Sequence, residues 1–219
     1  MSTKFALTLL GVGNAAAHSL GNASAVVEQN SSPTLLLDCG FDTLNRFQAR
    51  YGSSLPSAIF ITHGHLDHIG GLEGLFFRAL RTDRLIRLFV PVTIVALLHD
   101  RLATYPGALA EDGVNFWDRF QLIPVSDEFW HEGLRYEVFE TRHHRPRSSY
   151  GLRLRHRFVW TGDTRPIPET LSVVANAGER VFHDCALEGN PSHTGVDDLL
   201  REYSVEFLRR LVAYHYESE

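Results

Sequence analysis

The 219 residues suit one domain of ordinary size or one large α/β domain, and 44% hydrophobic residues can bury a substantial core. The formal net charge of −5 argues against a protein that coats nucleic acid. No run resembles a membrane-spanning helix, and the early "FALTLLGVG" lacks the basic segment and cleavage site of a signal peptide. We therefore expect a cytoplasmic protein with no membrane partner.

Strand-like and helix-like segments alternate along the chain. The expected strands span residues 4–11, 24–28, 34–40, 58–63, 87–91, 120–125, 134–140, 150–156, 157–163, 180–185 and 209–216. The expected helices span residues 42–52, 71–82, 91–103 and 196–207. Early strands cluster as hairpins and later ones alternate with helices. This order predicts two sheets packed together with helices outside them, rather than a doubly wound parallel sheet.

The segment "FITHGHLDHIGG", residues 60–71, places four polar side chains directly after an apolar run. His63, His65 and Asp67 alternate, and His68 follows at once. Because alternate residues of an extended segment point to the same side, His63 and His65 are expected to face one ion, and Asp67 with His68 a second. Imidazole and carboxylate groups suit zinc, and also manganese or iron.

Glycines flank these four residues. Gly64 is expected to let the backbone bend sharply, and Gly70 and Gly71 to permit close approach where the next helix begins.

The segment resembles the signature of the metallo-β-lactamase fold superfamily, and further motifs resemble its RNase Z-like and phosphodiesterase-like branch. These motifs are "THGHLDHIGGL", "LLGVGNAAAHSLGNASAVVE", "TLLLDCGFDTL", "WTGDTRP", "SHTG" and "AYHY". The resemblance implies an α/β (α+β) fold of the four-layer αβ/βα sandwich type, in a single domain over residues 1–219. It also implies two divalent metal ions, with zinc as the first choice and manganese or iron as alternatives.

The resemblance also implies where the remaining metal ligands lie. A histidine of "ETRHHRPRS" is expected to be the third ligand of the first ion, and the spacing to Gly151 favours His144 over His143. Asp163 matches the carboxylate that bridges the two ions, and His215 matches the last histidine of the second ion. Opposite charge on both sides would keep such a carboxylate ionised.

His193 in "NPSHTG" is implied to assist the leaving group or to bind phosphate, without binding metal. Its carboxylate partner is expected to be Asp184, although this branch usually has a glutamate there. We hypothesise that a metal-bound hydroxide attacks the phosphorus of a small phosphodiester, a cyclic nucleotide or cyclic phosphate. Asp67, His193 and Asp184 are the catalytic candidates, and Asp67 is a metal ligand as well.

Substrate and partners are less closely defined by the sequence. Arg145, Arg147 and Arg165 are candidates for phosphate contacts, since the guanidinium fork suits phosphate oxygens. The chain has a single lysine and no long arm rich in glycine and lysine, so RNA is a less favoured substrate than a small phosphodiester. A homodimer is compatible with the resemblance.

Other functions of the same fold give different expectations. The alternatives are an RNase Z-like RNA endonuclease and a thioester, lactone or β-lactam hydrolase, the last group lacking a histidine like His193. A flavodiiron oxidoreductase has a glutamate where His65 stands, and a non-catalytic scaffold would have lost ligands. The complete ligand set favours an enzyme.

Overall fold

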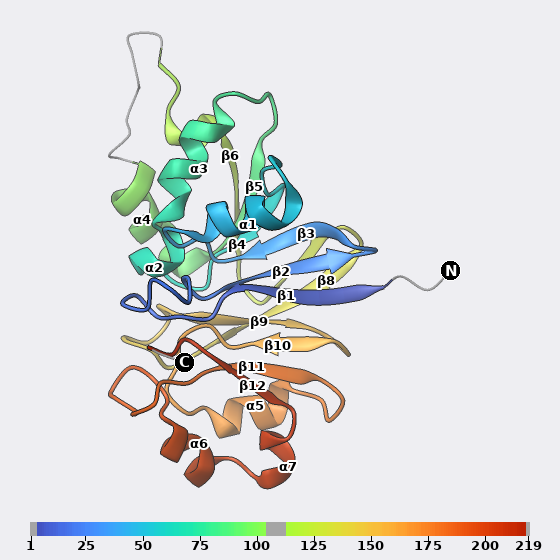
Figure 1. Cartoon of the computed structure of the whole chain (residues 1–219), viewed down its shortest axis with the longest axis vertical. Coiled ribbons are helices and arrows are strands. Elements are labelled where there is room, and N and C mark those ends of the chain that lie inside the picture. The colour runs from blue at the N-terminus through green and yellow to red at the C-terminus, as the bar shows by residue number, and fades with distance from the viewer. Residues whose placement is uncertain (1–3, 104–112, 218–219) are drawn as a thin grey trace. The chain divides into compact units, whose positions relative to one another are not determined.

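The computed structural model describes residues 4–103 and 113–217. The chain divides into two compact units, residues 1–124 and 125–219, and each unit contains a six-stranded sheet. No helix in these described ranges is long and apolar enough to cross a membrane. The expectation of two sheets with helices is confirmed, and the architecture is mixed α/β (Figure 1).

The first unit has strand order β1-β2-β3-β4-β5-β6. Its strands are β1 (Phe5–Gly11), β2 (Ser24–Gln29), β3 (Ser32–Leu37), β4 (Ala58–Phe60), β5 (Ile86–Pro91) and β6 (Phe120–Val125). Its helices are α1 (Thr43–Tyr51), α2 (Leu66–Ile69), α3 (Gly71–Ala79) and α4 (Val95–Leu98), with short turns η1 (Val92–Ile94), η2 (His99–Ala103) and η3 (Phe116–Asp118). The strands β1 to β3 pair antiparallel, as the hairpin pattern predicts, and β3 to β5 pair parallel.

The second unit has strand order β12-β11-β10-β9-β8-β7. Its strands are β7 (Glu128–His131), β8 (Leu134–Glu140), β9 (Tyr150–Leu154), β10 (Phe158–Trp160), β11 (Arg180–Asp184) and β12 (Leu211–Tyr214). Its helices are α5 (Pro168–Val174), α6 (Val196–Glu202) and α7 (Val205–Leu208). Neighbours from β7 to β10 pair antiparallel, and β10, β11 and β12 pair parallel.

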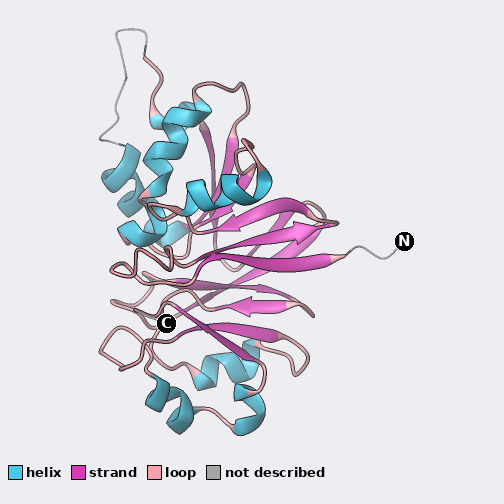
Figure 2. Cartoon of the chain, in the orientation of Figure 1, coloured by secondary structure: helices cyan, strands magenta, loops and turns pink. Residues whose placement is uncertain are grey.

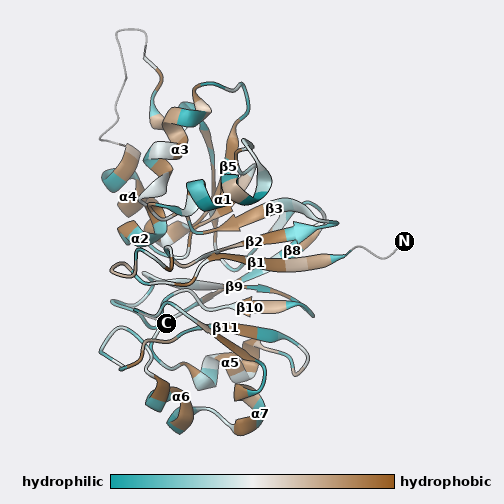
Figure 3. Ribbon diagram, viewed as in Figure 1, coloured by the Kyte–Doolittle hydropathy of each residue, from teal (hydrophilic) through white to brown (hydrophobic). Residues whose placement is uncertain are grey.

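Apolar side chains form the core of each unit. In the first unit the β3 side chains from Leu35 to Leu37 are at most 1% exposed. In the second unit Val159 and Val181 pack in one cluster with Leu171 of α5 and Leu199 of α6. Figure 2 shows the helices of this unit gathered on one side of its strands, and Figure 3 shows much of β3 and β11 coloured as hydrophobic. In each unit the apolar strands end in loops that carry polar residues, such as Asp38 after β3 and Asp163 after β10.

Several element boundaries follow local sequence rules. Helix α1, expected over residues 42–52, ends at Tyr51, and Gly52 follows it with a φ of 74° that suits glycine. The expected helix over residues 91–103 is instead three short segments, η1, α4 and the π-helical η2. The expected helix over residues 196–207 breaks between α6 and α7, because the Ser204 side chain accepts a hydrogen bond from the backbone N–H of Phe207 and starts a new helix.

Candidate metal and phosphodiester site

The first ligand set lies where β4 ends and α2 begins. His63 and His65 lie on an extended segment, as the sequence predicts, because His65 is the N-cap residue of α2 and has an extended backbone. Asp67 and His68 lie on the helical turn itself, which differs from the extended spacing expected from the sequence. His63 Nε2 and His65 Nδ1 are 3.1 Å apart, and His68 Nε2 is 3.5 Å from Asp67 Oδ2.

Buried glycines let the chain fold tightly around this turn. A Cβ on Gly71 would lie 2.2 Å from the carbonyl oxygen of Gly40, so the expected close approach at the start of α3 is confirmed. Gly64 has no positive φ among the residues described; instead, a Cβ there would lie 2.6 Å from Leu97 Cδ2. A side chain at position 64 would thus require Leu97 to move.

Asp38, which the sequence motifs do not assign, organises the first ligand set. Its Oδ2 atom accepts hydrogen bonds from His68 Nδ1 and from Thr62 Oγ1, both at 2.8 Å. Thr62 Oγ1 in turn lies 3.0 Å from Nδ1 of His63. With Nδ1 of both histidines protonated, Nε2 is the lone-pair nitrogen in each ring, which is the form that binds a metal ion.

Asp38 could have been found from its position after β3. It follows the apolar strand β3, which pairs in parallel with β4. In this pairing Leu36 lies opposite Ile59 and Leu37 lies opposite Phe60. Parallel strands end at the same edge of a sheet, so a polar residue after one strand lies beside a polar residue after the next.

The second set lies at one edge of the second sheet. Because β10, β11 and β12 are parallel, Asp163, Asp184 and His215 all follow or occupy the carboxyl ends of neighbouring strands. Gly162, with a φ of 64°, makes the turn that carries Asp163 away from β10. His215 also has a positive φ of 71°, a conformation that histidine adopts more readily than most side chains.

Asp163 contacts two imidazoles. Its Oδ2 atom is 3.2 Å from His215 Nε2 and 3.8 Å from His143 Nε2. Two ligand atoms that bind one tetrahedral ion at ordinary bond lengths lie about 3.3 Å apart. The ligand pairs within each unit are therefore spaced as donor atoms around a cation are, and the donor set of imidazoles and carboxylates suits a divalent metal ion.

The structure places His143, not His144, beside Asp163. His143 is 2% exposed and donates from Nδ1 to the carbonyl oxygen of Ser192 at 2.9 Å, whereas His144 is exposed. Burial lowers the pKa of His143 to about 4, against the attraction of Asp163, so its ring is neutral near pH 7. The geometry thus favours His143, against the spacing argument that favoured His144.

His193 and Asp184 form the pair expected from the sequence. His193 Nδ1 is 2.8 Å from Asp184 Oδ2, and the backbone N–H of Thr164 donates to the same oxygen at 2.8 Å. The other oxygen of Asp184 lies 3.5 Å from His215 Nδ1, so one carboxylate orients both rings. Burial lowers the pKa of His193, but the hydrogen bond and charge of Asp184 outweigh it and raise this pKa above its ordinary value.

Asp184, His193 and His215 also offer one ligand atom each, and these atoms lie within 4.8 Å of one another.

His183, next to Asp184, has a different role. It is fully buried and its Nε2 atom lies 2.8 Å from the Tyr203 hydroxyl, so it is a core histidine.

Comparison with known proteins identifies relatives over almost the whole chain. The family model described as "Anti-Pycsar protein Apyc1" matches residues 5–219. The protein of that name from Paenibacillus harenae is 32% identical over 204 residues, which cover 89% of this chain and 83% of the relative.

Two solved structures share the fold. The metallo-β-lactamase fold protein YhfI of Bacillus subtilis matches with a TM-score of 0.76 and 14% identity, over 99% of this chain and 87% of its own. A diphosphatase from the PhnP family matches with a TM-score of 0.76 and 19% identity, over 98% and 87%. This chain therefore has the metallo-β-lactamase fold, belongs to the Anti-Pycsar Apyc1 family, and is a metal-dependent phosphodiesterase.

Proposed function

We propose that this protein hydrolyses a small phosphodiester, a cyclic nucleotide or a cyclic phosphate. The observation that carries the proposal is the hydrogen bond between His193 and Asp184, at the same sheet edge as Asp163 and His215. This pair supplies a proton donor beside ligand-type side chains, which is the arrangement that a departing alkoxide needs.

The residues that would hold the metal are the two ligand sets. Two divalent ions are proposed, as the sequence motifs imply, with zinc as the first choice and manganese or iron as alternatives. The proposed ligands are His63, His65, Asp67, His68, His143, Asp163 and His215. Such ions, when bound, polarise a phosphoryl group and make a water molecule acidic enough to attack near neutral pH.

His193 is proposed as the general acid. Its Nδ1 atom faces Asp184, so the proton that it transfers is the one on Nε2. A water molecule forms the new P–O bond as Nε2 gives its proton to the leaving oxygen and the bond from phosphorus to that oxygen breaks. The product is a phosphomonoester with a freed hydroxyl group, both on one molecule when the substrate is cyclic. Asp184 stabilises the protonated imidazole before transfer and holds its ring in place.

A small substrate agrees with the charge of the chain. A protein that grips RNA needs many cationic contacts to phosphates, and this chain has a net charge of −5 with a single lysine. An RNase Z-like endonuclease is the second candidate. Thioester hydrolysis is disfavoured, because a thiolate leaves without the proton that the His193–Asp184 pair supplies, and lactone hydrolysis is disfavoured because the resemblance implies that lactone hydrolases of this fold lack a histidine like His193.

The test measures hydrolysis of an aryl phosphodiester, cyclic nucleotides, a tRNA precursor, a thioester and a lactone, together with metal content. Replacing His193 with alanine is expected to lower kcat for cyclic nucleotides by about 10²- to 10⁴-fold, with metal content unchanged. The loss is expected to be smaller for the aryl ester, because an aryloxide leaves without help from a strong acid. The exposed His156→Asn is the control.

Two results would count against the proposal. Turnover of the thioester or lactone alone contradicts phosphodiester hydrolysis. Equal losses for aryl and alkyl leaving groups in His193→Ala contradict the role of His193 as general acid, while leaving the substrate class intact.

A further inference from the structure

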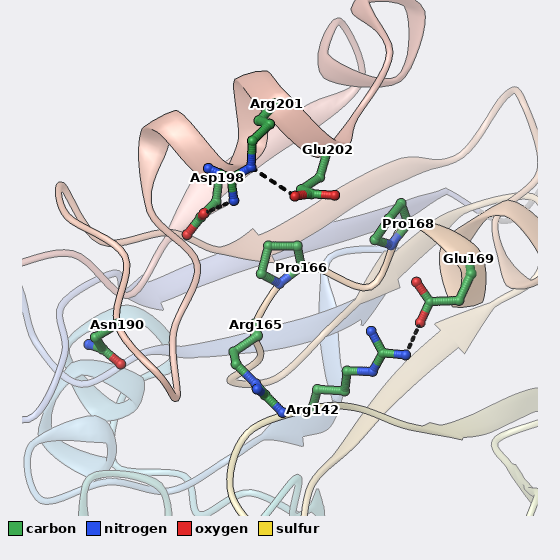
Figure 4. Close-up of a pocket in the computed structure, with 9 residues that line it drawn as sticks. All are labelled: Arg142, Arg165, Pro166, Pro168, Glu169, Asn190, Asp198, Arg201 and Glu202. Atoms are coloured by element: carbon green, nitrogen blue, oxygen red, sulfur yellow. Dashed lines mark hydrogen bonds and ion pairs between the residues drawn. The ribbon is translucent and has the colours of Figure 1, made fainter.

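A cavity of about 480 Å³ opens in the second unit (Figure 4). Its lining residues are Arg142, Arg165, Pro166, Pro168, Glu169, Asn190, Asp198, Arg201 and Glu202. The volume lies within the range of sites for small organic molecules and is too small for a folded polymer.

All but one of the charged side chains that line this cavity form ion pairs with one another. Arg142 bonds Glu169 at 2.7 Å, and Arg201 bonds both Asp198 and Glu202, the latter at 2.9 Å. In Figure 4 dashed lines reach both of these arginines, and none reaches Arg165. Among the nine lining residues, all of them described, Arg165 is the single charged side chain without an ion-pair partner. The three arginines and three carboxylates of the lining balance in formal charge, but Arg201 is shared by two carboxylates, so the guanidinium of Arg165 is the one that no carboxylate engages.

The backbone of Arg165 is held in place. Its N–H donates to the carbonyl oxygen of Arg142 at 2.7 Å, and Pro166 restricts it to an extended conformation. A fixed backbone lowers the entropy cost of presenting the guanidinium to a ligand.

Three lining residues belong to segments that carry or support the proposed site residues. Arg142 precedes His143, and Arg165 follows Thr164, whose N–H donates to Asp184. The Oδ1 atom of Asn190 accepts from the backbone N–H of His193 at 3.0 Å. A ligand in the cavity thus lies beside the loops that position the reacting groups.

We propose that this cavity is an anion subsite, in which Arg165 binds a phosphate oxygen. A guanidinium fork matches two phosphate oxygens better than an ammonium group does. The phosphate comes either from the phosphodiester substrate or from its phosphomonoester product. The assignment of these two sources rests on the proposed function, whereas the anion site itself does not.

The test compares Arg165→Gln and Arg165→Lys with wild type. Arg180→Gln is the matched control, because Arg180 is an exposed arginine at the start of β11 in the same unit and does not line the cavity. Kinetics with bis(p-nitrophenyl) phosphate give kcat and KM, inorganic phosphate as an inhibitor gives Ki, and calorimetric titration with inorganic phosphate gives Kd.

Arg165→Gln is expected to weaken phosphate binding about tenfold, Arg165→Lys less, and Arg180→Gln not at all. A tenfold rise in KM with unchanged kcat identifies the substrate as the source of the phosphate. A tenfold rise in Ki with unchanged KM identifies the product.

The proposal is overturned if Arg165→Gln has the KM, Ki and Kd of wild type. If wild type hydrolyses no phosphodiester, the proposed function fails. The calorimetric titration then still decides the anion site, since it requires no turnover.

Discussion

At the scale of single residues, Asp38 links the first ligand set into one network. It is completely buried, has a φ of 59°, and contacts His68 and Thr62 through three hydrogen bonds. A buried carboxylate that fixes the tautomer of a metal-binding histidine commonly changes metal affinity by 10- to 100-fold when it is altered. Asp38 is therefore a positioning residue for the proposed metal centre.

We expect Asp38→Asn to lower metal affinity by about 10- to 100-fold, because the neutral amide holds the His68 ring more weakly than the carboxylate does. Asparagine tolerates a positive φ, so the backbone is preserved. Competition with a chelator of known affinity measures the effect. The control is Asp118→Asn, the same charge change at an exposed capping position of η3. Equal metal affinity in both variants would contradict a positioning role for Asp38.

Residue burial favours His143 as the ligand, whereas the spacing in the sequence favoured His144. His143 and His144 are adjacent and chemically identical, so the sequence left both as ligands. The buried one is the ring that donates to the carbonyl oxygen of Ser192, a contact between residues 49 apart. Only the folded chain brings these two segments together.

At the scale of elements, the sequence predicted most strands because their apolar runs are long and bounded by turns. Every expected strand overlaps an observed one, and β7, with the residues EFWH, was missed because polar and apolar side chains alternate over four residues only. Helix α5 was missed as well; a buried Leu171 anchors it in the core, and Pro168 begins it. Such short elements owe their existence to tertiary packing.

Buried Arg153 ties the second sheet to the turn before β11. It bonds Glu179 at 2.8 Å and Glu137 at 2.9 Å, and Glu179 also accepts backbone N–H groups of Asn176 and His156. Burial raises the pKa of Glu179, but these hydrogen bonds, that of Arg153 first, outweigh it and hold the pKa below the ordinary value of 4.5. The ionised carboxylate is thus the form that stabilises the folded state.

We expect Glu179→Gln to reduce the free energy of unfolding at pH 7 by about 3 kcal/mol, since it leaves the Arg153 charge less compensated. The carboxyl group of Glu179 has a lower pKa in the folded state than its ordinary value. Its contribution is therefore complete above the ordinary pKa of 4.5 and is lost as the pH falls through the lower folded value.

Urea unfolding from about pH 7 to about pH 3 measures both effects. The difference between wild type and Glu179→Gln should shrink toward zero at the acid end. Glu128→Gln removes an exposed pair with Arg135 and should change stability by less than about 1 kcal/mol at any pH. A wild-type advantage that stays constant with pH would refute the assignment of Glu179.

At the scale of the whole molecule, the proposed ligands and the proposed acid all follow strand ends. The first unit presents them after β4, and the second unit after β8, β10, β11 and β12. The alternation of apolar runs and polar ends was visible in the sequence, and this is why the ligand types could be predicted. The supporting contacts of Asp38, Thr62 and Thr164 depend on strand register, which the sequence pattern did not specify.

Removing divalent ions is expected to lower stability as well as activity. The proposed ligands His68 and Asp163, 0% and 1% exposed, would lose the cation that offsets their burial. A ligand present at about 100 times its dissociation constant stabilises a protein by about 2.7 kcal/mol, which corresponds to about 5 to 10 °C in Tm for a chain of this size. Thermal unfolding with and without a chelator measures the shift, and added zinc or manganese should restore both Tm and turnover. Asp163→Asn serves as the comparison, because a chain that has lost this ligand should respond less to the chelator. An unchanged Tm in chelated wild type, with activity lost, would mean that the metal serves the chemistry alone and contributes nothing to the fold.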